Sequence, residues 1–133
     1  MANLRMAVVV RRDLQLTPGL LAAQVAHISA LFVQKAMRRH HKTNDDLILV
    51  ELTGTQIDWI NEPYIVILAC ETPEELAVIT KMAQDEKLPV HEWKDVIPST
   101  VLEGRVLDCL VGIAIGPSDS DQLKKVTGML PLY

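Results

Sequence analysis

The sequence predicts an α/β fold in which helices cover both faces of a four-stranded, mixed β-sheet, forming a three-layer sandwich. Three observations support this prediction. Short, continuous apolar runs indicate buried strands, threonine–proline pairs mark helix starts, and strands alternate with helices along most of the chain. The length of 133 residues suits one domain of ordinary size, which we place at residues 1–133.

The first strand is predicted at Leu4–Arg12, because the run MAVVV has the unbroken hydrophobicity of a strand covered on both faces. The next stretch, Thr17–Gln34, carries no formal charge and begins like a helix. Thr17 suits an N-cap and Pro18 suits the first helical position. Small and aliphatic residues occupy nearly every side, so we expect a buried helix that continues to about His41.

Gln24 and His27 interrupt this apolar helix, and their spacing of three places them on one face. Buried polar side chains need hydrogen-bond partners, and most of them find these within the core. Two interpretations are therefore open: Gln24 and His27 are satisfied core residues, or they belong to a functional site.

The later elements have clearer boundaries. We predict strands at Tyr64–Cys70, Leu88–Trp93 and Val106–Ile115, and helices at Thr72–Lys87 and Asp121–Val126. The helix after Thr72 begins with a threonine N-cap, a proline at the first helical position and a glutamate that closes a capping box.

Two segments are less readable. Asp45–Glu62 contains the short run Leu47–Val50, which is either strand or buried helix, while Trp59 is expected to pack at the edge of the core. Asp95–Gly104 is expected to be a loop.

Composition bears on the compartment. Cys70 and Cys109 both lie inside apolar runs, which favours buried free thiols in a reducing cytoplasm. The uncharged run Leu14–Gln34 approaches the ~20 residues that a bilayer requires. Its proline, glycine, glutamines and histidine argue against a membrane span, and Met6–Val10 is too short for a signal peptide. We therefore expect a soluble, cytoplasmic chain with no membrane partner.

Charge is distributed unevenly along the chain. Residues 1–44 hold seven basic side chains and one acidic one, a formal charge of +6, whereas the rest of the chain carries −10. A polyanion would therefore meet the first third of the chain. A solvated helix end is the plainer explanation for the basic run 35–42, and the pI near 5.5 is unlike the broad basic face of many nucleic-acid binders.

No general catalytic signature is present: the sequence has no Walker loop, GxGxxG, HExxH or GxSxG motif. His40 and His41 are adjacent and make a poor metal pair, and we expect neither a metal nor a cofactor.

Both ends of the chain resemble one family. The segments VRRDL at 10–14 and LAAQVAH at 21–27 resemble the opening of the archaeal and eukaryotic type (class II) of peptidyl-tRNA hydrolase. The segments IGP at 115–117 and LKKVTGMLPLY at 123–133 resemble its ending. The likeness extends through Glu74–Val90 and covers essentially the whole chain. It implies the family's fold, hydrolysis of the ester between a peptide and tRNA, and a homodimer.

The resemblance also implies site residues. Gln24 matches the family's glutamine, Asp95 its aspartate and Ser99 its threonine, and these three are the predicted catalytic residues. The family's lysine is replaced by Leu20, and a neighbouring basic position by Pro18. A further set is predicted to bind substrate: Thr17, His27, Arg11, Arg12 and Thr100.

Ester hydrolysis requires an activated water and a stabilised oxyanion. Asp95 would orient or deprotonate the water, Ser99 would relay a hydrogen bond, and Gln24 would donate to the carbonyl oxygen. The amides after Thr17, or His27, would partly replace the missing lysine. For Asp95, Ser99 and Thr100 the plain alternative is loop hydrogen bonding to neighbouring backbone.

Two functions are consistent with these residues. The first is a hydrolase acting on peptidyl-tRNA, with tRNA or peptidyl-tRNA as its partner. The second is a catalytically degenerate member of the fold that binds RNA, a nucleotide or a protein, which Leu20 and Pro18 favour.

Overall fold

The computed structural model describes residues 3–38, 49–98 and 106–133. The strands are β1 (Leu4–Arg11), β2 (Ile65–Cys70), β3 (Val90–Pro98) and β4 (Val106–Asp119). The helices are α1 (Pro18–Ser29), α2 (Leu31–Arg38), α3 (Gly54–Asn61), α4 (Pro73–Asp85) and α5 (Ser120–Thr127), with a 3-10 turn at Arg12–Leu14.

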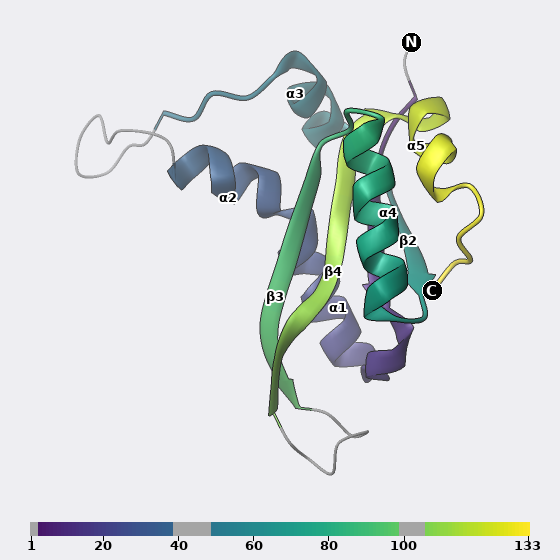
Figure 1. Ribbon diagram of the computed structural model, residues 1–133. Coiled ribbons are helices and arrows are strands. Elements are labelled where there is room, and N and C mark those ends of the chain that lie inside the picture. The colour runs from purple at the N-terminus through teal and green to yellow at the C-terminus, as the bar shows by residue number, and fades with distance from the viewer. Residues whose placement is uncertain (1–2, 39–48, 99–105) are drawn as a thin grey trace.

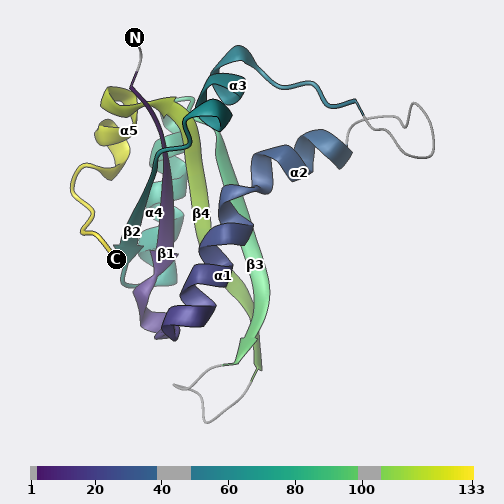
Figure 2. The same cartoon turned by 180° about the vertical axis from the view of Figure 1, so that it is seen from behind.

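The four strands form one mixed sheet in the order β2-β1-β4-β3. β1 runs parallel to β2 and antiparallel to β4, and β4 runs antiparallel to β3. Helices α4 and α5 cover one face of the sheet and α1 to α3 cover the other (Figures 1 and 2). The predicted three-layer sandwich with a four-stranded mixed sheet is therefore confirmed.

The run MAVVV builds both layers of the core from a single strand. Met6 to Val10 have no exposed surface, and successive side chains point to opposite faces of the sheet. Ala7 and Val9 pack beneath α4 and α5, while Met6, Val8 and Val10 pack beneath α1, α2 and α3. This is the covered central strand that the sequence predicts.

The predicted buried helix differs from the structure in two ways. Thr17 caps it as expected, with the Leu20 N–H donating to Thr17 Oγ1 at 3.4 Å. However, α1 ends at Ser29, and α2 continues at an angle of 44°. Only Gln24 and Ile28 of α1 are buried, because one stripe of the helix faces the sheet and its alanines tolerate exposure.

No single helix within the described ranges is long and apolar enough to cross a membrane. The bent pair α1 and α2 satisfies the criteria of length and composition when its two parts are joined.

The predicted end of the third strand at Trp93 is wrong. β3 continues to Pro98, and Asp95 pairs with Cys109 of β4, so Asp95 lies in a strand and not in a loop. β4 likewise runs beyond Ile115, because residues through Asp119 pair with β1. Long antiparallel pairing thus keeps polar residues in the sheet that local sequence would assign to a turn.

The segment that the sequence left unassigned contains α3. Thr53 and Gln56 form a capping box at its start. The sequence predicts Trp59 at the edge of the core; it is 5% exposed and belongs to the core itself, where its ring meets Phe32 edge-on at 5.7 Å. At α4, the Thr72 cap is also confirmed, but the Glu75 carboxylate accepts from the Glu71 N–H, one residue before the expected partner.

Candidate functional site

Gln24 and Asp95 meet between α1 and β3. Gln24 Nε2 donates to Asp95 Oδ2 at 3.0 Å, although 71 residues separate the two. Gln24 is 3% exposed, whereas Asp95 is partly open to solvent. Gln24 is therefore enclosed by protein, whereas the Asp95 carboxylate can reach water. Both interpretations of Gln24 therefore apply. Its side chain is buried and hydrogen-bonded, and its partner is a residue of the predicted site.

Asp95 is held at both carboxylate oxygens. Oδ1 accepts from the Val96 N–H at 2.8 Å, and Oδ2 accepts from Gln24. Each carboxylate oxygen has a second lone pair for a further donor. This arrangement fixes the direction of the carboxylate and leaves capacity for a water molecule.

Both β1 and α1 come close to Gly112 of β4. A Cβ atom at Gly112 would lie 2.4 Å from the Val9 carbonyl oxygen and 3.0 Å from Ile28 Cδ1. Gly112 is also the register partner of Trp93, and the register shifts directly after this pair. The missing side chain therefore leaves room for the β1 backbone and for the tip of Ile28 from α1 at the level of the site.

Trp93 completes the contact and was missed by sequence reasoning. Its Nε1–H donates to Gln24 Oε1 at 2.6 Å. The exposed His27 ring stacks on the Trp93 indole, with ring centroids 4.9 Å apart and planes inclined by 21°. Trp93 and Asp95 are two apart on one strand and so share a face. A predicted strand that extended two residues further, to Asp95, would have placed Trp93 and Asp95 on the same face.

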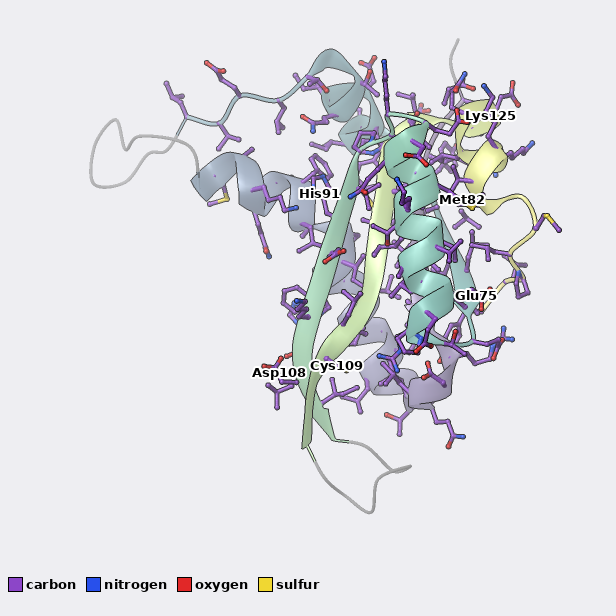
Figure 3. The ribbon with its side chains drawn as sticks, viewed as in Figure 1. Glu75, Met82, His91, Asp108, Cys109 and Lys125 are labelled. Atoms are coloured by element: carbon purple, nitrogen blue, oxygen red, sulfur yellow. The ribbon has the colours of Figure 1, made fainter. Side chains whose placement is uncertain are left out.

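A further polar contact joins α2 to β3. His91 Nδ1 lies 2.8 Å from Lys35 Nζ of α2. Figure 3 shows His91 well along β3 from Cys109, which is the register partner of Asp95. Side chains from α1 and α2 therefore meet alternate residues of β3 at several levels.

Leu20 lies one turn before Gln24 on α1 and brings no charge to the site. Most of the amides expected to compensate for it are already engaged. Pro18 has no N–H, the Leu20 N–H donates to the Thr17 side chain, and the Leu21 N–H donates to the Thr17 carbonyl oxygen. Among residues 18–21, all of which the structure describes, the Gly19 N–H is the amide that remains available to donate to an external oxygen.

Arg11 and Arg12 lie at the end of β1, and each guanidinium has partners within the chain. Arg11 contacts both oxygens of Asp13, at 3.0 and 2.7 Å, and the carbonyl oxygen of Leu110. Arg12 contacts Glu71 at 2.9 Å and the carbonyl oxygen of Leu132, and its guanidinium lies over the Tyr133 ring.

Four groups near this end of the sheet have shifted pKa values. Hydrogen bonding to Asp13 raises the pKa of Arg11 above the ordinary value of an arginine. Burial raises the pKa of the Cys70 thiol to about 12, and it also raises the pKa values of Cys109 and Tyr133. Both cysteines are free, with Cys70 buried and Cys109 partly so.

Ser99 and Thr100, predicted to relay a hydrogen bond and to bind substrate, lie outside the described residues. Within the described part of the chain, no group of three or more His, Cys, Asp or Glu side chains is arranged to hold a metal ion.

Comparison with known proteins gives one consistent result. The family described as peptidyl-tRNA hydrolase PTH2 matches residues 4–133. A Methanopyrus kandleri protein named peptidyl-tRNA hydrolase is 33% identical over 96% of this chain and 97% of its own length. Proteins of the same name from Nanoarchaeum equitans and Haloquadratum walsbyi are 31% and 30% identical, over 95% and 98% of this chain and 96% and 100% of their own lengths.

A solved structure shares the fold. A protein of unknown function from Agrobacterium tumefaciens aligns over 100% of this chain and 99% of its own, with a TM-score of 0.58 and 16% identity. The match to the family spans nearly the whole sequence. The chain therefore belongs to the PTH2 family of peptidyl-tRNA hydrolases.

Proposed function

We propose that the chain hydrolyses the ester bond between a peptide and the ribose of tRNA. The observation that carries this proposal is the hydrogen bond between Gln24 and Asp95. It joins the two described residues that match the family's glutamine and aspartate. The relatives named above, which carry the name peptidyl-tRNA hydrolase, support the same substrate.

Asp95 acts on the attacking water. A carboxylate fixed by Val96 and Gln24 accepts a hydrogen bond from water and orients its oxygen toward the ester carbonyl carbon. As the C–O bond forms, the proton passes to the carboxylate and negative charge develops on the carbonyl oxygen. Collapse of this tetrahedral intermediate breaks the bond to the ribose oxygen, which takes the proton back from Asp95 and leaves as a hydroxyl, so that the carboxylate is regenerated.

Gln24 has a second N–H besides the one bound to Asp95. We propose that this N–H donates to the carbonyl oxygen of the substrate and that the Gly19 amide assists it. A neutral donor stabilises an oxyanion less than a lysine would. Hydrolysis is therefore expected to be slow compared with family members that have the lysine.

The tRNA part of the substrate is proposed to contact Thr17, His27, Arg11 and Arg12, while Ser99 and Thr100 are proposed to act beside Asp95. Support comes from position: Val10 and Trp93 both pair with Gly112, so the end of β1, the start of α1 and the Asp95 region share one end of the sheet.

Leu20 favours a second function, binding of tRNA without hydrolysis. One assay separates the two. Purified protein is incubated with peptidyl-tRNA and the released peptide is measured, with Asp95→Asn alongside. As a matched control, Asp85→Asn removes an exposed carboxylate that pairs with Lys81 on α4. Turnover in the parent and in Asp85→Asn, but not in Asp95→Asn, supports hydrolysis. Tight tRNA binding with release no faster than in Asp95→Asn supports the second function.

We further propose a cytoplasmic homodimer. The family resemblance supports it, and so does an apolar pair on α4, where Val78 and Met82 lie one turn apart and are 59% and 42% exposed. Met82 is marked in Figure 3. Sedimentation equilibrium tests this: twice the chain mass supports a dimer, and a monomer at micromolar concentration contradicts it.

A further inference from the structure

We propose that Trp93 is a positioning residue, whose indole N–H sets the orientation of the Gln24 amide and thereby keeps an N–H directed at Asp95. The kinetic part of this inference rests on the proposed hydrolysis. The structural part does not, because it concerns contacts among three side chains.

The chemistry of the two neighbours leaves one orientation for Gln24. An indole nitrogen only donates, so the Gln24 atom 2.6 Å away must be the oxygen. A carboxylate only accepts, so the atom 3.0 Å from Asp95 must be the nitrogen. The two constraints act on opposite ends of one amide and agree. A rotation of 180° would set acceptor against acceptor at Asp95 and donor against donor at Trp93.

Trp93 is itself held in place. Its backbone pairs with Gly112 in the sheet, and the His27 ring stacks on its indole at 4.9 Å. Gln24 is buried, so a lost donor at its oxygen would not be replaced freely by water. The direction of the Asp95 carboxylate thus depends on a relay that begins at His27 and passes through Trp93 and Gln24.

Trp93→Phe tests the relay, because it removes the N–H and keeps an aromatic ring beneath His27. We expect kcat for peptidyl-tRNA to fall by about tenfold or more, with KM changed by less than about twofold, since positioning of the reacting groups is lost. Trp59→Phe is the matched control. It removes the N–H of the other indole, which is buried and donates to the Tyr64 carbonyl oxygen, and should leave kcat within about twofold.

A double variant shows whether Trp93 acts through Gln24. Gln24→Met keeps the length of the side chain and removes both hydrogen bonds. In this background Trp93→Phe should lower kcat by less than about twofold, because the relay is already broken. A folded Trp93→Phe variant with unchanged kcat would overturn the proposal, and so would single-variant losses that multiply in the double variant.

A spectroscopic readout separates this inference from the proposed function. The chain has two tryptophans, so a ¹⁵N-labelled sample shows two indole N–H signals, which Trp59→Phe assigns. Gln24→Met should shift the Trp93 signal and speed its exchange with water by about tenfold or more. If the parent protein does not hydrolyse peptidyl-tRNA, this result still supports the relay. An unchanged Trp93 signal in Gln24→Met refutes it.

Discussion

Gln24 Nε2 and Asp95 Oδ2 lie 3.0 Å apart, one on the second turn of α1 and the other on edge strand β3. The two residues are 71 positions apart in the sequence. Their contact exists because α1 packs on the sheet, with Ile28 next to Gly112, and because β3 runs past Trp93.

Gln24→Glu should place a second carboxylate about 3 Å from Asp95 while still accepting from Trp93. Two such carboxylates resist ionising together, so the variant should lose stability as pH rises from 5 to 8. Thermal unfolding across this range measures the effect. Gln56→Glu is the control, since Gln56 lies in the exposed capping box of α3. Equal pH dependence in Gln24→Glu and the parent would show that the two carboxylates do not interact.

Leu20→Lys should raise hydrolysis by about tenfold or more, because a cation one turn before Gln24 would add to the oxyanion stabilisation proposed for Gln24 and the Gly19 amide. Initial rates with peptidyl-tRNA measure it. Ala22→Lys adds the same charge at an exposed position of α1 and should raise the rate much less. If the two variants respond alike, general attraction of tRNA accounts for the gain.

Gly112→Ala should destabilise the protein by ~1–3 kcal/mol and lower activity, because the added methyl group meets the Val9 carbonyl oxygen and Ile28. Denaturant unfolding gives the free energy. At Gly54, a Cβ would meet nothing within 4 Å, so Gly54→Ala should change stability little. A Gly112→Ala variant as stable as Gly54→Ala would mean that Val9 and Ile28 can move away from the added methyl group at no cost.

Cys70 should resist alkylation in the folded protein, since burial and the nearby acidic side chains raise its pKa to about 12. A raised thiol pKa also means that the native state is favoured while Cys70 is protonated. That contribution should be complete below pH 9 and fade as pH rises toward 12. Mass spectrometry after iodoacetamide treatment at pH 8 measures the labelling. Labelling of Cys70 as fast as in urea would contradict the buried environment.

Binding of tRNA should weaken steeply with salt if phosphates are contacted at the Arg12 end of β1. Arg12→Gln should reduce the slope of log affinity against log salt by about one, whereas Lys81→Gln on α4 should leave it unchanged. Affinity measurements between 50 and 200 mM salt, with uncharged tRNA, give the slope independently of hydrolysis. Equal slopes for Arg12→Gln and the parent would exclude a phosphate contact at Arg12.

Much of the fold follows from local patterns. The run MAVVV predicts a strand covered on both faces, and the threonine caps at Thr17 and Thr72 mark the starts of α1 and α4, as observed. These features depend on residues within one turn or one strand of each other, so the sequence determines them by itself.

The predicted site also depends partly on sequence and partly on tertiary structure. Matching to a family pattern selects Gln24 and Asp95 from sequence, and their spacing along the chain gives no sign that they touch. The structure brings them together and adds Trp93, whose place next to Gln24 depends on β3 extending to Pro98. That extension comes from pairing with β4, which strand propensity near Asp95 does not reveal.

The sequence by itself therefore determined the α/β class, the central strand, the caps that start α1 and α4, and the family to which the chain belongs. Only the tertiary structure decided that the apolar helix is buried along one stripe, that Arg11 and Arg12 have partners within the chain, and how the Gln24 amide is oriented. The physical reason is range. Caps and continuous apolar runs involve near neighbours, whereas the orientation of one buried amide depends on a donor 69 residues away and an acceptor 71 residues away.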